Sequence, residues 1–423
     1  MDIETLFQRI RRGYQKNKPD WNALRKGYFP DFVTNGKIST IIDYVPVFTF
    51  HFVKPSSFEA QLQFLSVNGY RTIDPNHFYA ILIGEKPVPE RAVLLTFDDG
   101  WGSLWRYAYP LLKKYRMQAV AFIIPGLITE KVTNRPNLED VWSGAVDSSV
   151  LAEGNTTDER LCSWHEIQAM SDSGVLNFQS HTMHHSQVFV ADRLIDFYHP
   201  KFDNSPANLN MPNFHNSDTD CDLTREPAWG MPLYAYAPRA AGKRRYYDDE
   251  RIRKACVDHV RKNGREKFFK SRGWRRELRR VLAHARGVGT DNGRFESEEN
   301  MREAIYQDLL DSRRTIEAKL SGHNVTHLCY PYYVGSDLAV EVSRQAGYVA
   351  NYWGFVEGCN ANRPGDDPFR IVRIDERFLF RLPGQGRKTL SRILVSNLTR
   401  DSGQFLRRLR SSERGHSVYS TES

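Results

Sequence analysis

Apolar and polar positions alternate along residues 41–190 with two different periods. Short runs of consecutive apolar residues predict buried strands, whereas apolar residues three and four positions apart predict the helices that cover them. The expected strands fall within residues 41–53, 92–100, 118–126 and 175–181. The expected helices fall within residues 56–70, 102–116 and 163–174. This alternation predicts a parallel sheet wrapped by helices, either a barrel or a doubly wound sheet.

The regular pattern is interrupted by one long segment, residues 191–296. This segment is rich in Pro, Asn and aromatic residues and then becomes basic and helical. A structureless loop of that length is improbable inside a compact domain, so we expect an inserted subdomain. The sequence therefore predicts five parts: an N-terminal arm (1–40), an α/β domain in two pieces (41–190 and 297–386), the insertion between them (191–296), and a basic tail that is partly disordered (387–423).

Composition and charge indicate which partners and which location in the cell to expect. The formal net charge is +8, which suits an anionic surface such as a membrane face or an acidic glycan. No segment approaches the roughly 20 apolar residues of a membrane helix, and no export signal is evident. The five scattered cysteines suggest neither disulfides nor a cysteine-based zinc site. We expect a cytoplasmic protein without nucleic-acid partners, either free or peripheral at the inner membrane face. The amphipathic arm would dock on the main domain or on that membrane.

Residues typical of metal-dependent hydrolysis follow the predicted strands. Asp98 and Asp99 end one strand, and a second strand ends just before His181 and His185, which one turn of helix would set on the same side. Two imidazoles and one carboxylate are a common ligand set for a catalytic divalent metal that keeps an open position for water. A second carboxylate can then act as general base. The two adjacent aspartates could divide these tasks.

Three motifs resemble those of one enzyme family. "TFDDG" (96–100), "SHTMHH" (180–185) and "YPYY" (330–333) are similar to the signature motifs of polysaccharide deacetylases, the NodB-homology or carbohydrate esterase family 4 proteins. The resemblance covers about 45–190 and 297–380 and implies an irregular (β/α)7 barrel. It further implies a divalent metal, with zinc expected, at the carboxyl ends of the strands. By position, the resemblance makes Asp98 the general base, makes Asp99, His181 and His185 the metal ligands, and places Pro331 and Tyr332 beside the oxyanion through a backbone N–H.

Two positions depart from the family pattern. Tyr333 stands where the third motif usually continues with glycine, and the usual C-terminal leucine-x-histidine, which supplies the general acid, is absent. In the branch whose third motif reads "YPYG", the acid histidine lies on the first strand instead. His51 occupies that position, so the resemblance implies that His51 is the acid. The alternative is that His51, which lies among aromatic residues, belongs to the core.

The resemblance implies a hydrolase of carbon–nitrogen amide bonds that removes the N-acetyl group from an N-acetylhexosamine in a glycan or glycan precursor. Two other hypotheses remain open. One is an amidase or deformylase acting on another acylated sugar, and the other is a catalytically silent glycan-binding protein of the same fold. The aromatic and basic residues of the insertion could stack on sugar rings and pair with phosphate, or they could simply pack the subdomain.

Overall fold

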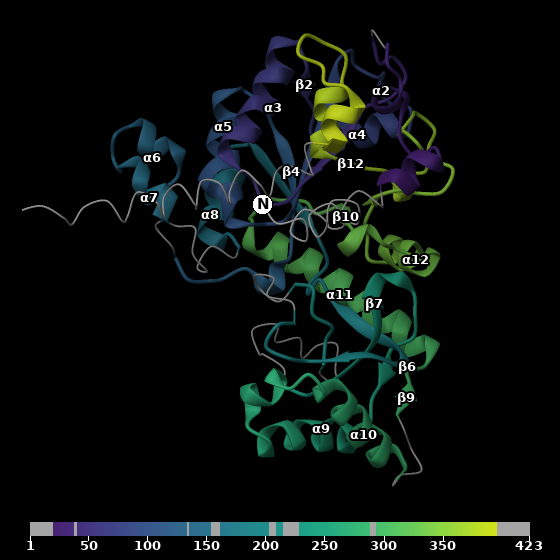
Figure 1. The fold of residues 1–423 in the computed structure, drawn as a ribbon. Helices are drawn as coiled ribbons and strands as arrows, with labels where there is room; N and C mark the ends of the chain where they lie inside the picture. The colour runs from purple at the N-terminus through teal and green to yellow at the C-terminus, as the bar shows by residue number, and fades with distance from the viewer. Residues whose placement is uncertain are drawn as a thin grey trace, which may run out of the picture.

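The computed structural model describes residues 20–37, 40–132, 135–153, 161–202, 209–214, 228–287 and 293–395. An entirely parallel sheet forms the main body of the molecule (Figure 1). Seven strands follow one another in the order β11-β10-β5-β4-β3-β1-β12, and β2 pairs with the start of β3. The strands are β1 (Val47–Phe50), β2 (Arg71–Thr72), β3 (Ala92–Asp99), β4 (Ala119–Ile123), β5 (Leu176–Ser180), β10 (His327–Cys329), β11 (Ala350–Tyr352) and β12 (Ile374–Asp375).

The sheet curls until its two edges meet at one short segment. Ile371 forms a parallel bridge with Tyr352 of β11, and its N–H donates to the carbonyl oxygen of Asn351 at 3.0 Å. Three residues later Ile374 pairs with Phe48 of β1. The segment 371–375 therefore touches both edges of the sheet. This arrangement confirms the irregular (β/α)7 barrel predicted from the sequence, and the doubly wound alternative is wrong.

Helices cover the outside of the sheet, and local sequence explains where they begin. Asp74 caps α4 by accepting from the N–H groups of Asn76 and His77, and Ser163 and Glu166 form a capping box at α8. Pro110 falls at the start of α5, directly after a π-helical turn (104–108), where its missing N–H costs little. The barrel helices are α2 (Asp31–Thr34), α3 (Pro55–Val67), α4 (Pro75–Leu82), α5 (Tyr109–Lys114), α6 (Leu138–Trp142), α7 (Ser148–Glu153), α8 (Trp164–Asp172), α11 (Glu298–Lys319) and α12 (Asp337–Gln345).

The inserted elements form a separate body at one end of the molecule (Figure 1). They comprise two antiparallel strand pairs and two helices: β6 (Gln187–Phe197) with β7 (Pro232–Pro238), β8 (Tyr246–Tyr247) with β9 (Arg294–Phe295), α9 (Glu250–Lys262) and α10 (Trp274–Gly287). A core of their own joins Phe197 to the apolar faces of α9 and α10. The buried Glu296 carboxylate binds the Arg239 guanidinium at 2.5 and 2.8 Å, which ties the end of β7 to the exit of the insertion. The exact domain boundaries stay a prediction.

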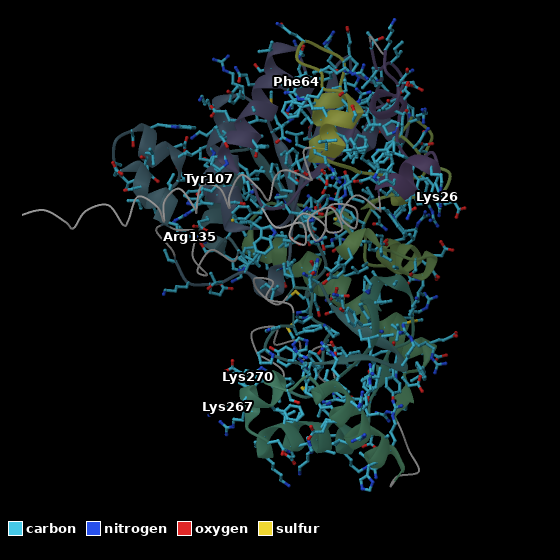
Figure 2. The ribbon with its side chains drawn as sticks, viewed as in Figure 1. Lys26, Phe64, Tyr107, Arg135, Lys267 and Lys270 are labelled. Atoms are coloured by element: carbon cyan, nitrogen blue, oxygen red, sulfur yellow. The ribbon has the colours of Figure 1, made fainter. Side chains whose placement is uncertain are left out.

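The two ends of the chain are only partly described. Residues 20–37 pack on the barrel, where Phe32 and Val33 of α2 join its core. Residues 1–19, on which the predicted amphipathic helix mostly falls, and residues 396–423 of the predicted tail lie outside the described part. No helix in the described ranges is both long and apolar enough to cross a membrane. Figure 2 shows the side chains on this frame.

Candidate metal centre

The two adjacent aspartates end β3 on the same side of the sheet. Successive side chains of a regular strand point to opposite faces, so two neighbours cannot normally line one cavity. Here the backbone turns left-handed, with φ of 71° at Asp99 and 82° at Gly100. A side chain at Gly100 would also meet Ile123 at 3.0 Å. Glycine therefore permits the turn, whereas the left-handed Asp99 costs roughly 1–2 kcal/mol. This strained turn lets Asp98 and Asp99 both face the cavity.

The two histidines reach the same place from the end of β5. The His181 N–H donates to the Ile123 carbonyl oxygen at 2.9 Å, which continues the ladder to β4. Thr182 and His185 then adopt left-handed backbones, with φ of 65° and 54°. The Thr182 hydroxyl accepts from the His185 N–H at 3.0 Å. An irregular loop, and not the single helical turn considered in the sequence analysis, thus brings the imidazoles together.

Three side chains converge at distances suited to one metal ion. Asp99 Oδ1 lies 3.4 Å from His181 Nε2 and 3.6 Å from His185 Nε2. Two ligand atoms held about 2.1 Å from one tetrahedral ion are about 3.4 Å apart. All three side chains are more than nine-tenths buried, and their ligand atoms lie within 4.8 Å of one another. The described residues therefore fit a divalent cation without rearrangement.

Neighbouring groups orient these three side chains. His181 Nδ1 donates to the carbonyl oxygen of Cys329 at 2.9 Å, which turns Nε2 toward Asp99. The Trp101 indole N–H donates to Asp99 Oδ2 at 2.8 Å and leaves Oδ1 facing the imidazoles. Trp101 follows Gly100 in the sequence, but nothing in the local pattern indicated this contact.

Asp99 and His185 have the protonation states that a cation requires, whereas a bound cation would displace the proton that His181 directs at Asp99. Burial by itself would raise the pKa of Asp99, but the hydrogen bond from His181 and the charge of the imidazoles lower it below its usual range. Burial would lower the pKa of His181, yet Cys329 and Asp99 raise it well above its usual value. Burial and the charge on His181 lower the pKa of His185 to about 4. At neutral pH an ionised carboxylate and a neutral imidazole therefore face the same point.

Asp98 lies beside this group but is held by a different partner. The Arg373 guanidinium donates to both of its carboxylate oxygens, at 2.6 and 2.8 Å. Both side chains are at most 2% exposed. Burial would raise the pKa of Asp98, but the charge and hydrogen bonds of Arg373, together with the charge of His181, lower that pKa below its usual value. The sequence pattern predicted no role for Arg373. A lone arginine between Val372 and Ile374 was the available signal, because a buried cation needs a partner.

His51 and the third motif complete the walls of the cavity. His51 follows β1, its side chain is 43% exposed, and its Nε2 lies 3.8 Å from Asp98 Oδ2. Pro331 is buried and starts a short turn in which Tyr332 and Tyr333 both have left-handed backbones, with φ of 58° and 64°. The centroid of the Tyr333 ring lies 6.0 Å from the centroid of the His51 ring and 5.2 Å from the Arg373 guanidinium. His51 therefore lines the cavity instead of belonging to the core.

The cavity has a volume of about 300 Å³, enough for a sugar ring with its substituents. Its wall combines barrel residues with two residues of the insertion, Leu209 and Asn210. The Tyr332 hydroxyl donates to the Leu209 carbonyl oxygen, which joins the third motif to the insertion. The lining residues are His51, Phe52, Asp98, Asp99, Trp101, His181, His185, Leu209, Asn210, Tyr332 and Tyr333.

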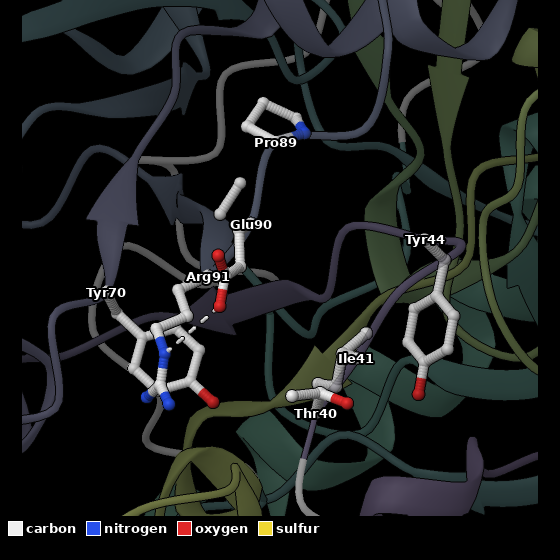
Figure 3. A pocket seen from close by; sticks show the side chains of 8 residues that line it. Thr40, Ile41, Tyr44, Tyr70, Pro89, Glu90 and Arg91 are labelled. Atoms are coloured by element: carbon white, nitrogen blue, oxygen red, sulfur yellow. Dashed lines mark ion pairs between the residues drawn. The ribbon is translucent and has the colours of Figure 1, made fainter.

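A second hollow lies away from this site, between Tyr44 and Tyr70 (Figure 3). Its volume is about 10 Å³, room for about one water molecule. Glu90 and Arg91 line it as an ion pair with 3.9 Å between their charged atoms. It is too small to hold a sugar.

Residues 85–207 match the family model described as polysaccharide deacetylase. Over this segment, less than a third of its length, the chain is similar to polysaccharide deacetylases. A place in the branch with a "YPYG" third motif stays a prediction. Among curated proteins, the putative polysaccharide deacetylase YxkH of Bacillus subtilis (strain 168) is 42% identical over 79 residues, 19% of this chain and 28% of the relative. A poly-beta-1,6-N-acetyl-D-glucosamine N-deacetylase of Escherichia coli (strain K12) is 26% identical over 130 residues, 31% of this chain and 17% of the relative.

The match spans less than a third of the length of these two deacetylases. Among solved structures, a de-N-acetylase from Aggregatibacter actinomycetemcomitans is 16% identical, with a TM-score of 0.46 over 79% of this chain and 96% of that chain. IcaB from Ammonifex degensii is 18% identical, with a TM-score of 0.43 over 85% of this chain and 100% of that chain.

We expect Arg373→Met to shift the acidic limb of the pH–rate profile of any hydrolysis at this site to higher pH. Without the guanidinium, Asp98 loses its strongest neighbouring charge, so its pKa rises and a higher pH is needed to ionise it. The ion pair contributes stability above the unfolded pKa of Asp98 and loses it as pH falls through the lower folded pKa. Breaking it should cost about 3–5 kcal/mol at neutral pH. Both effects are measured as kcat/KM against pH and as thermal unfolding.

The matched control is Arg370→Met, three residues away. Its guanidinium pairs with Asp337 in an exposed bridge, which is worth at most about 1 kcal/mol. An Arg373→Met profile that coincides with the profiles of Arg370→Met and of the unmodified protein would show that Arg373 does not set the ionisation of Asp98.

Proposed function

We propose that the chain is a metal-dependent hydrolase that removes the N-acetyl group from an N-acetylhexosamine unit of a glycan. One observation carries the proposal: Asp99 Oδ1 lies 3.4 and 3.6 Å from two imidazole nitrogens, with the ionised Asp98 beside them. The match of residues 85–207 to the polysaccharide deacetylase model supports the reaction class. The name of the Escherichia coli relative supports an N-acetylated glucosamine polymer as substrate class.

In this proposal Asp99, His181 and His185 hold the cation. A divalent cation with this ligand set, zinc by its preference for imidazole and carboxylate, lowers the pKa of a water molecule and polarises a carbonyl oxygen. Asp98 takes a proton from the attacking water as the water oxygen bonds to the acetyl carbon. Arg373 keeps Asp98 ionised for this step and holds its orientation.

Breaking the carbon–nitrogen bond requires an acid that reaches the sugar nitrogen. We assign this task to His51, which protonates the sugar nitrogen so that it leaves as an amine while acetate remains. The side chain is half-exposed on the cavity wall and lies near Asp98, so both can reach one substrate. The oxyanion that develops on the acetyl group would accept a hydrogen bond from a backbone N–H near Tyr332, after Pro331. The left-handed turn at Tyr332 and Tyr333 sets the direction of those N–H groups.

The direct test is release of acetate from a panel of N-acetylated glucosamine oligomers and sugar conjugates, with and without added zinc. The proposal expects zinc-dependent release from N-acetylated members and none from their N-deacetylated counterparts. Faster release from N-formylated sugars would favour a deformylase. Binding of glycans by the zinc-loaded protein without any hydrolysis would favour a silent binding protein.

His51→Ala should lower kcat by about 10²–10⁴-fold and leave the bound metal in place, because it removes a proton donor and no ligand. Metal content per protein and steady-state kinetics measure the two effects. His165→Ala is the control, because that histidine is exposed on α8 and does not line the cavity. Equal rates for the two variants would require a different acid.

A further inference from the structure

The helical pair of the insertion carries the positive charge of the whole chain. Residues 250–287 hold 14 of its 59 lysines and arginines but only 4 of its 51 acidic residues, a net charge of +10. The other residues hold 45 cationic and 47 acidic side chains, a net charge of −2. The excess of +8 is therefore a property of α9, α10 and the turn between them.

Six exposed cations gather on the turn and on α10, and they form no ion pair with any described residue. We call them the cationic patch: Lys267, Lys270, Arg272, Arg276, Arg279 and Arg280. Arg275 between them is different, because its guanidinium binds Asp196 at 2.9 Å. Figure 2 shows Lys267 and Lys270 at the outer surface of the inserted body.

Folding does not explain the patch. The core side of α10 is formed by Trp274, Leu278 and Leu282, four residues apart. Arg276 and Arg280 lie half a turn away from these residues and so point away from the core. Since like charges at i and i+4 destabilise a helix, the pair Arg276 and Arg280 opposes the stability of α10. A cost of this kind suggests a ligand that neutralises these charges.

The shape of the patch favours a surface over a pocket. Lys267 and Lys270 lie on the turn 265–270, Arg272 follows it, and the other three cations lie on α10. α9 and α10 lie at the end of the molecule farthest from β2 and α3, where a flat partner meets no other part of the barrel (Figure 1). The apolar faces of both helices are already buried in the insertion core, and neither helix exposes a large apolar side chain. The contact therefore depends on charge alone, without insertion into an apolar layer.

We propose that the cationic patch docks the protein on a phospholipid bilayer with anionic head groups. A bilayer presents a plane of phosphates, and guanidinium groups bind phosphate through two parallel hydrogen bonds. Nucleic acid also presents phosphates, and the test below separates it from a bilayer. The same subdomain lines the cavity through Leu209 and Asn210. Docking would therefore fix the height of the cavity above the bilayer.

The test measures co-sedimentation of the full chain with phosphatidylcholine vesicles that contain or lack phosphatidylglycerol. We expect binding only to the anionic vesicles. We also expect release in about 1 M salt, where charges more than about 3 Å apart are largely screened from each other. Arg272, Arg276, Arg279 and Arg280 are then replaced by Gln, which has a similar helix propensity. Each lost charge should weaken binding about fivefold, so the quadruple variant should bind a few hundredfold more weakly.

The control replaces Lys26, Lys37, Lys86 and Lys131 by Gln, which removes the same charge from exposed positions outside the insertion. This variant should bind the vesicles like the unmodified chain. The proposal fails if the patch variant binds as tightly as the control, or if neutral vesicles bind equally well. It also fails if duplex DNA, at equal phosphate concentration, removes the protein from the vesicles. Acetate release from a short soluble glycan should be unchanged in the patch variant, so this proposal and the proposed function fail separately.

Discussion

Asp98→Asn is expected to keep its metal and to lose about 10²–10⁴-fold in kcat. The amide has nearly the shape of the carboxylate and still accepts hydrogen bonds from Arg373, but it cannot take a proton from water. Because Arg373 occupies both carboxylate oxygens of Asp98, Asp98 is not a proposed ligand and the bound metal should not change. Metal analysis and single-turnover kinetics on the same preparation separate the two effects.

One further outcome of this experiment is informative. Arg373 becomes a buried cation without an ionised partner in Asp98→Asn, so the variant should also unfold at a lower temperature. The rate must therefore be measured well below the unfolding transition. Normal turnover by the folded, metal-loaded variant would mean that another group accepts the proton.

Asp99→Asn is expected to lose the metal and, with it, all measurable zinc-dependent activity. Asp99 supplies the only carboxylate of the proposed ligand set, and an amide oxygen is a weaker ligand for zinc. A cation that binds only the folded state raises its stability in proportion to the logarithm of the ligand concentration. Added zinc should therefore raise the unfolding temperature of the unmodified protein and leave that of Asp99→Asn unchanged.

Asp98→Asn is the matched control for this experiment, because it removes the neighbouring charge without removing a ligand. Its unfolding temperature should still rise with zinc. If zinc stabilised Asp98→Asn less than Asp99→Asn, the proposed roles of the two aspartates would be reversed.

The sequence located much of the candidate site because parallel strands share one carboxyl edge. Asp98, Asp99, His181 and His185 each follow a predicted strand, so their convergence depends only on strand direction and order. The local backbone conformation was harder to predict from the sequence. The left-handed turns at Asp99 and His185 arise from tertiary packing, and no nearby glycine marks the turn at His185.

Arg373 shows where such reasoning stops. It meets Asp98 across 275 residues of sequence, and the pattern of burial along a strand does not state which charge a buried arginine will meet. The contribution of Leu209 to the cavity was equally hidden, because it lies in a segment without regular periodicity. The insertion was expected to begin as irregular chain, yet β6 begins at Gln187. Register shifts between Phe189 and Asp196 break the alternation that would have indicated this strand.

The closing segment 371–375 has a consequence for how the protein is synthesised. Until this segment has left the ribosome, β1 and β11 each have an open edge, and open edges can pair with other chains. Asp98 has no guanidinium partner during the same interval, because Arg373 belongs to that segment. A nascent chain therefore carries all three proposed metal ligands well before its proposed base is held in place. Because segment 371–375 is translated late, the barrel closes and Arg373 pairs with the proposed base Asp98 in the same late event.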